Sequence, residues 1–285
     1  MAEKSVRFVH LTDLHIVHAD HADPRVKSDT TANLLAARAQ IEAMDPPPAF
    51  IAVSGDLTNH GDVESFRTLR AAMDGIGVPV LYALGNHDSR AGFYQGMLDR
   101  TDDLNEPYNH EAVIEGIHII TLDSTVRGRI GGFFADGQLD FLADALESHP
   151  DLPKLLMFHH GPNLDLDPSG EWESLNIADT ERLAEVIEGY DIVGMLTGHL
   201  HMDRVAQWYG VPVILGMSLH CALDPLYSGE GIRTVNGTSL TICELRPSGL
   251  TVTFSPLPSD RAELSITTMA DLRAYEEALS ASVAA

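Results

Sequence analysis

The stretch Val78-Pro79-Val80-Leu81-Tyr82-Ala83-Leu84 runs directly into Gly85-Asn86-His87-Asp88, so an apolar run ends in side chains that can bind metal ions. Four more blocks of this kind follow apolar runs elsewhere in the chain: Asp13-Leu14-His15, Gly55-Asp56, Phe158-His159-His160 and Gly198-His199-Leu200-His201. Together the blocks supply carboxylates, a carboxamide and several imidazoles. That set is sufficient to hold two divalent cations side by side, an arrangement suited to hydrolysing phosphate esters.

The apolar runs have the length of strands and alternate with helical patterns. We expect strands at Val6–Leu11, Phe50–Ser54, Val78–Leu84, Ile117–Leu122, Lys154–Phe158, Ile192–Thr197 and Val211–Leu215. We expect helices at Thr31–Met44, Val63–Met73 with Asp62 as N-cap, Gln138–Leu146, Asp179–Ile187 and Met269–Leu279. This alternation predicts a layered α/β fold. Because ligands of such folds collect beyond the carboxyl ends of strands, we expect the five blocks to meet at one edge of one sheet.

The chain from Asp203 to Pro256 has a different character, with short β-like runs and turns at Tyr209-Gly210, Asn236-Gly237 and Ser248-Gly249. The Asn236-Gly237 pair predicts a hairpin between Arg233–Val235 and Ser239–Leu245. We expect residues 1–245 to form the main domain. Residues 246–285 would be a strand and helix extension, either part of the same compact unit or an oligomer contact.

The composition of the chain limits the classes of partner that we expect. The 285 residues are 44% hydrophobic and 21% charged, as in ordinary globular proteins, but the formal charge is −24. Such a surface repels nucleic acid polymers and anionic membranes, so neither is an expected partner. Cys221 and Cys243 form no disulfide framework and indicate reduced thiols. No signal peptide and no membrane-spanning run is evident, so a cytoplasmic location is expected.

Each block alone has an ordinary explanation. Asp56 could cap a helix, Asn86 could form an Asx turn, and of His159 and His160 one could be structural and the other solvent-facing. The joint occurrence of five blocks, in this order and each after a strand, instead favours a single site.

The five blocks resemble those of the calcineurin-like metallophosphoesterases, from about Arg7 to about Leu223. Finer detail is similar to the class III cyclic nucleotide phosphodiesterases and bacterial glycerophosphodiesterases: Gly55-Asp56-Leu57-Thr58-Asn59-His60-Gly61, Gly77-Val78-Pro79-Val80 and Leu175-Asn176. The usual H-H-P-P reads His159-His160-Gly161-Pro162, which could alter the substrate rim. The resemblance implies a four-layer α/β/β/α sandwich of two mixed sheets flanked by helices, with a small C-terminal β-hairpin and helix appendage.

The resemblance also implies a dinuclear centre of Fe, Mn, Co or Zn ions, which suit mixed oxygen and nitrogen ligands. One ion would be bound by Asp13, His15 and His201, the other by Asn86, His159 and His199, with Asp56 bridging. A metal-bridging hydroxide would attack phosphorus in line. His87 would stabilise the transition state or protonate the leaving alkoxide, and Asp88 could orient His87 or be a plain turn carboxylate.

Substrate contacts are expected from Asn59, His60, His160 and His220. Of these, His160 could equally lie behind the ligands, and His220 could be structural. The leading function is hydrolysis of small phosphodiesters of the cyclic nucleotide or glycerophosphodiester type. The alternatives are a phosphomonoesterase or phosphonate monoester hydrolase of the same fold, or a scaffold protein without turnover. The C-terminal region could form a homo-oligomer contact or a cap over the pocket.

Overall fold

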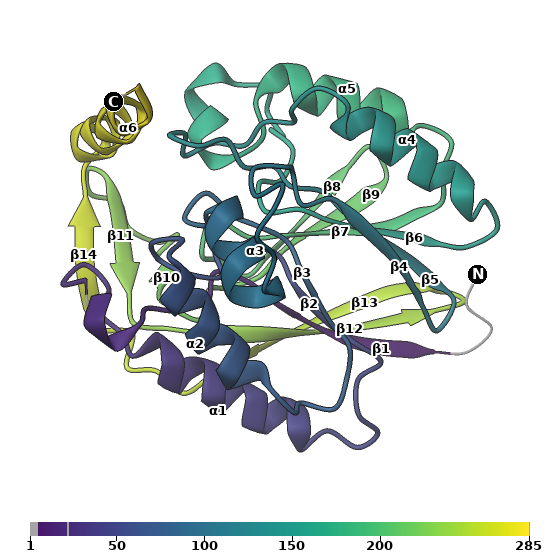
Figure 1. Ribbon diagram of the computed structural model, residues 1–285, viewed down its shortest axis with the longest axis horizontal. Coiled ribbons are helices and arrows are strands. Elements are labelled where there is room, and N and C mark those ends of the chain that lie inside the picture. The colour runs from purple at the N-terminus through teal and green to yellow at the C-terminus, as the bar shows by residue number, and fades with distance from the viewer. Residues whose placement is uncertain (1–4, 22, 285) are drawn as a thin grey trace.

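The computed structural model describes residues 5–21 and 23–284. Within them, most strands form two large sheets that lie face to face (Figure 1). One sheet has the order β13-β12-β1-β2-β3, from β1 (Val6–Leu11), β2 (Ile51–Val53), β3 (Val80–Tyr82), β12 (Ser239–Arg246) and β13 (Gly249–Pro256). The other has the order β4-β5-β6-β7-β9-β8, from β4 (His110–Ile114), β5 (Ile117–Thr121), β6 (Lys154–Met157), β7 (Ile192–Thr197), β8 (Arg204–Trp208) and β9 (Val211–Leu215).

Helices cover the outer face of each sheet (Figure 1). The five-stranded sheet is covered by α1 (Thr30–Glu42), α2 (Val63–Met73) and α3 (Arg90–Leu98), and the six-stranded sheet by α4 (Gln138–Ser148) and α5 (Ile177–Ile187). Each helical layer closes an apolar core, which includes Leu34 and Phe66 on one side and Leu142 and Leu183 on the other. The predicted four-layer α/β/β/α sandwich is therefore confirmed.

The central strands are buried on both faces, which explains their unbroken apolar sequences. In β1, Phe8 packs into the core between the two sheets, whereas Val9 packs under the helices. In β5, Ile119 and Ile120 divide in the same way between the inter-sheet core and the core beneath α4 and α5. Successive side chains of a strand point to opposite faces, so one strand supplies two cores.

Most predicted elements are present, with ends shifted by a few residues. The bounds of β1, β7, β9 and α2 match the prediction, and the Asp62 side chain caps α2 by accepting a hydrogen bond from the Ser65 amide. β8 falls in the predicted region of short β-like runs, whereas β4 (His110–Ile114) and α3 lie outside the predicted elements. Helix α3 begins directly after the Gly85–Asp88 block, where the Ser89 hydroxyl accepts from the Gly92 amide.

The predicted hairpin across Asn236-Gly237 is wrong. The strand before this turn, β11 (Ile232–Val235), pairs with β10 (Ala222–Leu223) and β14 (Glu263–Thr267) in a small third sheet. The strand after it, β12, pairs instead with β1 and β13, because its residues Leu240, Cys243 and Leu245 are buried in the main cores. The hairpin of this region joins β12 to β13, with Arg246 opposite Gly249.

The last part of the chain contributes to two sheets. β13 lies at the edge of the five-stranded sheet, and β14 leads from the small sheet into α6 (Met269–Ala284). The domain boundary at residue 245 stays a prediction. Two short 3-10 helices, η1 (Ala19–His21) and η2 (Pro168–Glu173), lie in connecting loops. Across residues 5–21 and 23–284, no helix combines the length and apolarity needed to cross a membrane.

Candidate metal centre

The five blocks converge, but from two sheets rather than one. The turns after β1, β2 and β3 carry Asp13, His15, Asp56 and Asn86, and the turns after β6 and β7 carry His159, His199 and His201. The expectation of one edge of one sheet is therefore wrong. Because the two sheets pack face to face through the inter-sheet core, the carboxyl ends of their parallel strands open onto a common space.

The backbone at these turns is held in an uncommon conformation. Left-handed φ angles, rare for residues other than glycine, occur at Asp13 (51°), His15 (46°), Asp56 (47°), His199 (77°) and His201 (49°). Neighbouring turns hold one another, since the Asp13 amide donates to Gly55 O (2.9 Å) and the His15 amide to Asp56 O (2.9 Å). Such strain persists where surrounding structure enforces it and is concentrated at functional sites.

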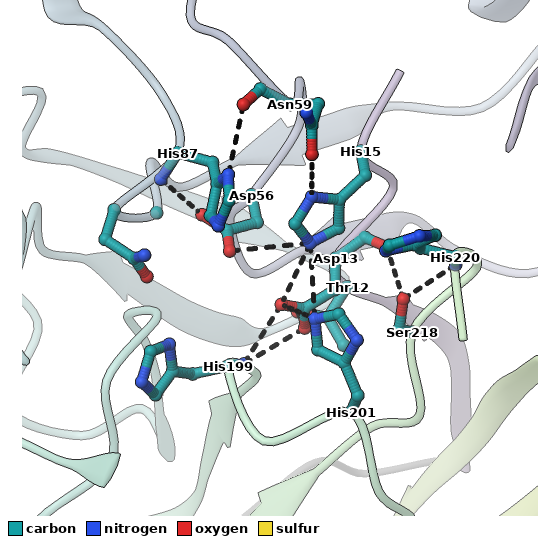
Figure 2. A network of polar contacts seen from close by, with 12 residues as sticks. Thr12, Asp13, His15, Asp56, Asn59, His87, His199, His201, Ser218 and His220 are labelled. Atoms are coloured by element: carbon teal, nitrogen blue, oxygen red, sulfur yellow. Dashed lines mark hydrogen bonds and ion pairs between the residues drawn. The ribbon is translucent and has the colours of Figure 1, made fainter. Parts of the chain in front are cut away.

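One group of side chains gathers around Asp13 (Figure 2). The ligand atoms of Asp13, His15, Asp56 and His201 all lie within 4.8 Å of one another. His201 Nε2 is 3.2 Å from both Asp13 Oδ1 and His15 Nε2. Two imidazole nitrogens and two carboxylates this close form a pocket for a cation, since all four can donate lone pairs to it.

A second group lies on the other side of Asp56. His159 Nε2 is 3.3 Å from Asp56 Oδ2, and His15 Nε2 from the first group is 3.6 Å from the same oxygen. The rings of His159 and His199 are 5.3 Å apart between centroids. The Asp56 carboxylate therefore lies between the two groups, as a residue shared by two cations must.

The far nitrogen of each candidate imidazole ligand has a protein partner. His159 Nδ1 donates to Ser54 O (2.9 Å), His15 Nδ1 to Asn59 Oδ1 (3.1 Å) and His199 Nε2 to Trp172 O (2.7 Å), while His201 Nδ1 contacts Cys221 Sγ (3.2 Å). These partners fix ring orientation and leave the other nitrogen with its lone pair facing the centre. In the described chain, the buried His159 Nε2 atom has no hydrogen-bond partner of its own. A metal ion would satisfy it.

The charges of the buried carboxylates in the centre also favour the binding of cations. Burial raises a carboxyl pKa, yet His201 and His159 hold the pKa of Asp13 well below its ordinary value, and His159 and His87 do the same for Asp56. Burial also favours a neutral imidazole, yet Asp56 and Asp13 raise the pKa of His159 to about 9. The pKa of His201 is raised as well, so two buried carboxylates favour protons on His159 and His201 as counter-charge. Metal ions can take the place of those protons.

His87 lies at the edge of the centre. Its amide donates to Asp56 Oδ1 (2.8 Å) and its Nδ1 atom donates to Asn59 O (3.0 Å). Its ring meets the His15 ring edge-on at 4.7 Å and lines the pocket. With Nδ1 engaged, Nε2 is the atom available to a substrate.

Of the two roles left open for Asp88, orienting His87 or serving as a turn carboxylate, its contacts fit the second. Its carboxylate accepts hydrogen bonds from the amides of Leu57 (2.9 Å), Thr58 (2.9 Å) and Gly85 (3.0 Å). Asp88 therefore ties the turn after β3 to the turn after β2, and the Asn59 carbonyl orients His87. Burial and the neighbouring Asp56 charge raise the pKa of Asp88 to about 7.

The predicted substrate contacts divide into two kinds. His60 and His220 line the open pocket, and the His220 ring lies 4.9 Å from the His15 ring. Asn59 also lines the pocket, but its side chain is engaged by His15 and by Asp23, to which it donates at 3.3 Å. His160 does not lie on the rim.

The His160 side chain is fully buried. Its Nδ1 atom pairs with the Ser124 hydroxyl (2.8 Å), and its Nε2 atom donates to Ile130 O (2.9 Å) and approaches Asn86 Oδ1 (3.2 Å). Of the two positions left open by the sequence, His160 takes the inner one. There it positions Asn86.

A pocket of about 490 Å³ opens over the centre. Its inner wall includes His15, Asp56, Asn86, His87, His199 and His201, and its outer wall includes Trp172, Leu272 and Tyr275. The supporting roles of Ser54, Trp172 and Cys221 are not among those predicted from the sequence. Two of the three act through backbone carbonyls, which have no sequence signature, but Cys221 adjoins His220 and could have been suspected.

Comparison with known proteins agrees with this geometry. The family model described as calcineurin-like phosphoesterase matches residues 6–203. A probable cyclic nucleotide phosphodiesterase from Rhodococcus erythropolis is 31% identical over 214 residues, which are 74% of this chain and 69% of the relative. A cAMP/cGMP dual specificity phosphodiesterase from Mycobacterium tuberculosis is 28% identical over 80% of this chain and 72% of its own length.

A probable glycerophosphodiester phosphodiesterase from Arcobacter nitrofigilis is 29% identical over 62% of this chain and 66% of the relative. Among solved structures, a dimetal phosphatase from Danio rerio superposes with a TM-score of 0.65. It covers 93% of this chain and 99% of its own at 13% identity, so the likeness concerns the fold.

Proposed function

Because the chain belongs to the calcineurin-like phosphoesterase family, we propose that it hydrolyses small phosphodiesters, of the cyclic nucleotide or glycerophosphodiester type, with a dinuclear metal centre. The observation that carries the proposal is the position of the Asp56 carboxylate between two groups of imidazoles whose free nitrogens face it. The relatives with these two activities support the substrate class.

We assign one metal ion to Asp13, His15 and His201 and the other to Asn86, His159 and His199, with Asp56 shared. The first set is supported by its mutual distances and the second by the unpartnered His159 Nε2 atom. Oxygen and nitrogen donors without a thiolate favour Fe, Mn, Co or Zn over Mg. Cys221 stays outside both sets because its Sγ atom contacts the outward-facing nitrogen of His201.

Two bound cations would lower the pKa of water and neutralise charge on the phosphate. The protein's own part is to orient the ester and to move a proton. Since His87 donates its Nδ1–H to Asn59 O, the imidazolium form, with its second proton on Nε2, would give that proton to the leaving alkoxide and become the neutral Nδ1–H imidazole. Asp88 and Asn59 hold the two turns that position His87 against Asp56.

A diester is favoured over a monoester because the arginines near the centre are already paired. Arg25, which lines the pocket, is bound to Asp23 (2.8 Å). A monoester carries two negative charges, which enzymes commonly grip with a forked guanidinium group. Arg90 follows the Gly85–Asp88 block, but it binds Asp123 (2.7 Å) and the carbonyl of Thr125 (2.9 Å). Its charge is therefore already paired. A scaffold without turnover is disfavoured because every candidate ligand position carries a metal-binding side chain.

The test is a comparison of bis(p-nitrophenyl) phosphate with p-nitrophenyl phosphate on protein reconstituted with Mn, Fe, Co or Zn. We expect kcat/KM to be at least about tenfold higher for the diester. A preference for the monoester would make the protein a phosphomonoesterase. No turnover of either compound by protein that holds two metal ions would favour the scaffold.

A second panel of cyclic AMP, glycerophosphocholine and a phosphonate monoester then separates the substrate types. A cytoplasmic location, the lack of nucleic acid or membrane partners, and homo-oligomer formation stay predictions from sequence.

A further inference from the structure

Much of the outer wall of the pocket is built by chain that follows the family match. Residues 6–203 match the family model and include Trp172, whereas five other residues of the wall come later in the chain: Leu223, Ile232, Leu264, Leu272 and Tyr275. They come from the small sheet of β10, β11 and β14 and from α6, which stand together at one end of the molecule in Figure 1. The metal centre and this later part of the chain thus contribute different parts of one pocket.

Helix α6 is fixed at both ends. At its start, the Asp271 carboxylate accepts from the Thr268 hydroxyl (2.7 Å) and β14 pairs with β11. Near its end, the Ser280 hydroxyl donates to Gly128 O (3.0 Å) in the loop between β5 and α4. The helix therefore bridges the small sheet and the loop that carries Ile130, another residue of the pocket.

One face of α6 is turned inward. Leu272 and Tyr275 are half-buried pocket residues, whereas Arg273 and Glu277 are exposed. Residues three positions apart share a helix face, so the leucine and the tyrosine present one continuous surface. The Arg25 guanidinium, which also lines the pocket, lies 6.0 Å from the centre of the Tyr275 ring, at the outer limit of a cation–π contact.

The polar groups of this wall are paired with one another. Thr234 and Ser265 share a hydrogen bond between their hydroxyls (2.7 Å), and Asp271 is engaged by Thr268. Arg25 is bound to Asp23 (2.8 Å). A ligand would therefore meet mainly apolar and aromatic side chains on this wall.

From this arrangement we propose that α6 and β14 form the specificity wall of the pocket, where Leu272 and Tyr275 contact the ester substituent and select a planar aromatic group over a polyol. The proposal rests on the proposed phosphodiesterase function. A planar ring can stack on the tyrosine and cover the leucine, whereas the hydroxyls of a polyol would face this apolar surface without partners.

The test measures kcat/KM for cyclic AMP and for glycerophosphocholine in Tyr275→Ala, Tyr275→Phe and Leu272→Ala. We expect Tyr275→Ala to lower kcat/KM for cyclic AMP by about tenfold, in line with the loss of one stacking partner, and to leave glycerophosphocholine nearly unchanged. Tyr275→Phe keeps the ring and should retain the selectivity. Glu277→Ala, on the exposed face of the same helix, is the matched control. Thermal melting confirms that each variant is folded.

Binding of 5′-AMP and of glycerol 3-phosphate to the metal-loaded protein, measured by calorimetry, gives a readout that needs no turnover. Tyr275→Ala should weaken the binding of 5′-AMP and leave the binding of glycerol 3-phosphate unchanged. If Tyr275→Ala lowers kcat/KM equally for both substrates, or leaves kcat/KM for cyclic AMP unchanged, the proposal of a specificity wall is wrong. The proposed phosphodiesterase function would not be affected by that result. A wild-type protein that hydrolyses neither diester would instead overturn the proposed function.

Discussion

Cys221 Sγ lies 3.2 Å from His201 Nδ1, on the side of the imidazole that faces away from Asp13. The thiol is buried, which raises a thiol pKa, but the adjacent His201 lowers the pKa of Cys221 to about 6. A polarisable sulfur thus occupies the position where the other candidate ligands have a carbonyl or amide oxygen. Its role is to hold the His201 ring against the carboxylates.

Replacing Cys221 tests this support. Cys221→Ala removes the partner of Nδ1 and should weaken metal binding roughly 10–100-fold, as loss of a supporting contact to a metal ligand commonly does. Cys221→Ser keeps a small acceptor and should lose less. Calorimetric titration of metal-free protein measures both. Cys243→Ala, in the core between the sheets, is the control, since it should lower the free energy of unfolding without changing metal affinity. Unaltered affinity in Cys221→Ala would contradict the role.

His87→Ala and Asp56→Ala separate proton transfer from metal binding. Since His87 is placed to protonate the leaving group, His87→Ala should lower kcat by about 10²–10⁴-fold and keep both metal ions. Asp56→Ala removes the carboxylate between the two groups and should leave the protein with less metal. Metal analysis by mass spectrometry alongside kinetics distinguishes the two, with the pocket-rim variant His60→Ala as a comparison. Equal metal loss in both variants would contradict the assignment of proton transfer to His87 and of metal binding to Asp56.

Which features could be predicted from the sequence depends on how far apart in the chain the interacting residues lie. The ligand blocks could be placed at strand ends because apolar runs and the glycine-containing turns after them are local signals. The assignment of those strands to two sheets depends on pairings such as β1 with β12, whose residues Phe8 and Cys243 are far apart in the chain. Local pattern does not encode such pairings, and for the same reason Asn236-Gly237 looked like a hairpin.

The contacts that orient the candidate metal ligands could not be predicted for a different reason. His199 is oriented by the carbonyl of Trp172, and His159 by the carbonyl of Ser54, groups that every residue possesses. Residue type therefore gave no clue. The suggestion that Asp88 orients His87 rested on their adjacency in sequence, whereas the partners of Asp88 in space are the amides of Leu57 and Thr58, as for the alternative of a turn carboxylate.

Metal uptake should depend strongly on pH. In the metal-free protein, Asp56 and Asp13 raise the pKa of His159 to about 9 despite its burial, so the proton must leave before Nε2 can bind a metal. Apparent metal affinity should therefore rise about tenfold per pH unit between about pH 7 and pH 9, and level off above. Titrations in buffers of different ionisation enthalpy count the protons released. An affinity independent of pH in this range would argue against His159 as a ligand.

The same shift predicts the stability of the metal-free protein. A histidine whose pKa is higher in the folded state than its unfolded value of about 6.5 stabilises the fold fully below that value, and the contribution is lost as pH rises through about 9. The melting temperature of metal-free protein should therefore fall from pH 7 to pH 9. Metal-loaded protein, in which cations replace the protons, should change less. Parallel curves for the two forms would contradict the assignment.

Gly85→Ala probes the close approach of the turn after β3 to Asp56. A Cβ atom at Gly85 would lie 2.2 Å from Asp56 Oδ1 and 2.3 Å from the Asp56 amide nitrogen, so the carboxylate proposed to bridge the metals would have to move. We expect a stability loss of about 1–3 kcal/mol from overpacking and a reduced metal content. Gly161→Ala is the matched control, because its Cβ would meet nothing closer than Thr197 at 3.5 Å, an ordinary contact. Melting curves and metal analysis compare the two, and a Gly85→Ala protein that retained both ions would show that Asp56 tolerates displacement and need not bridge them.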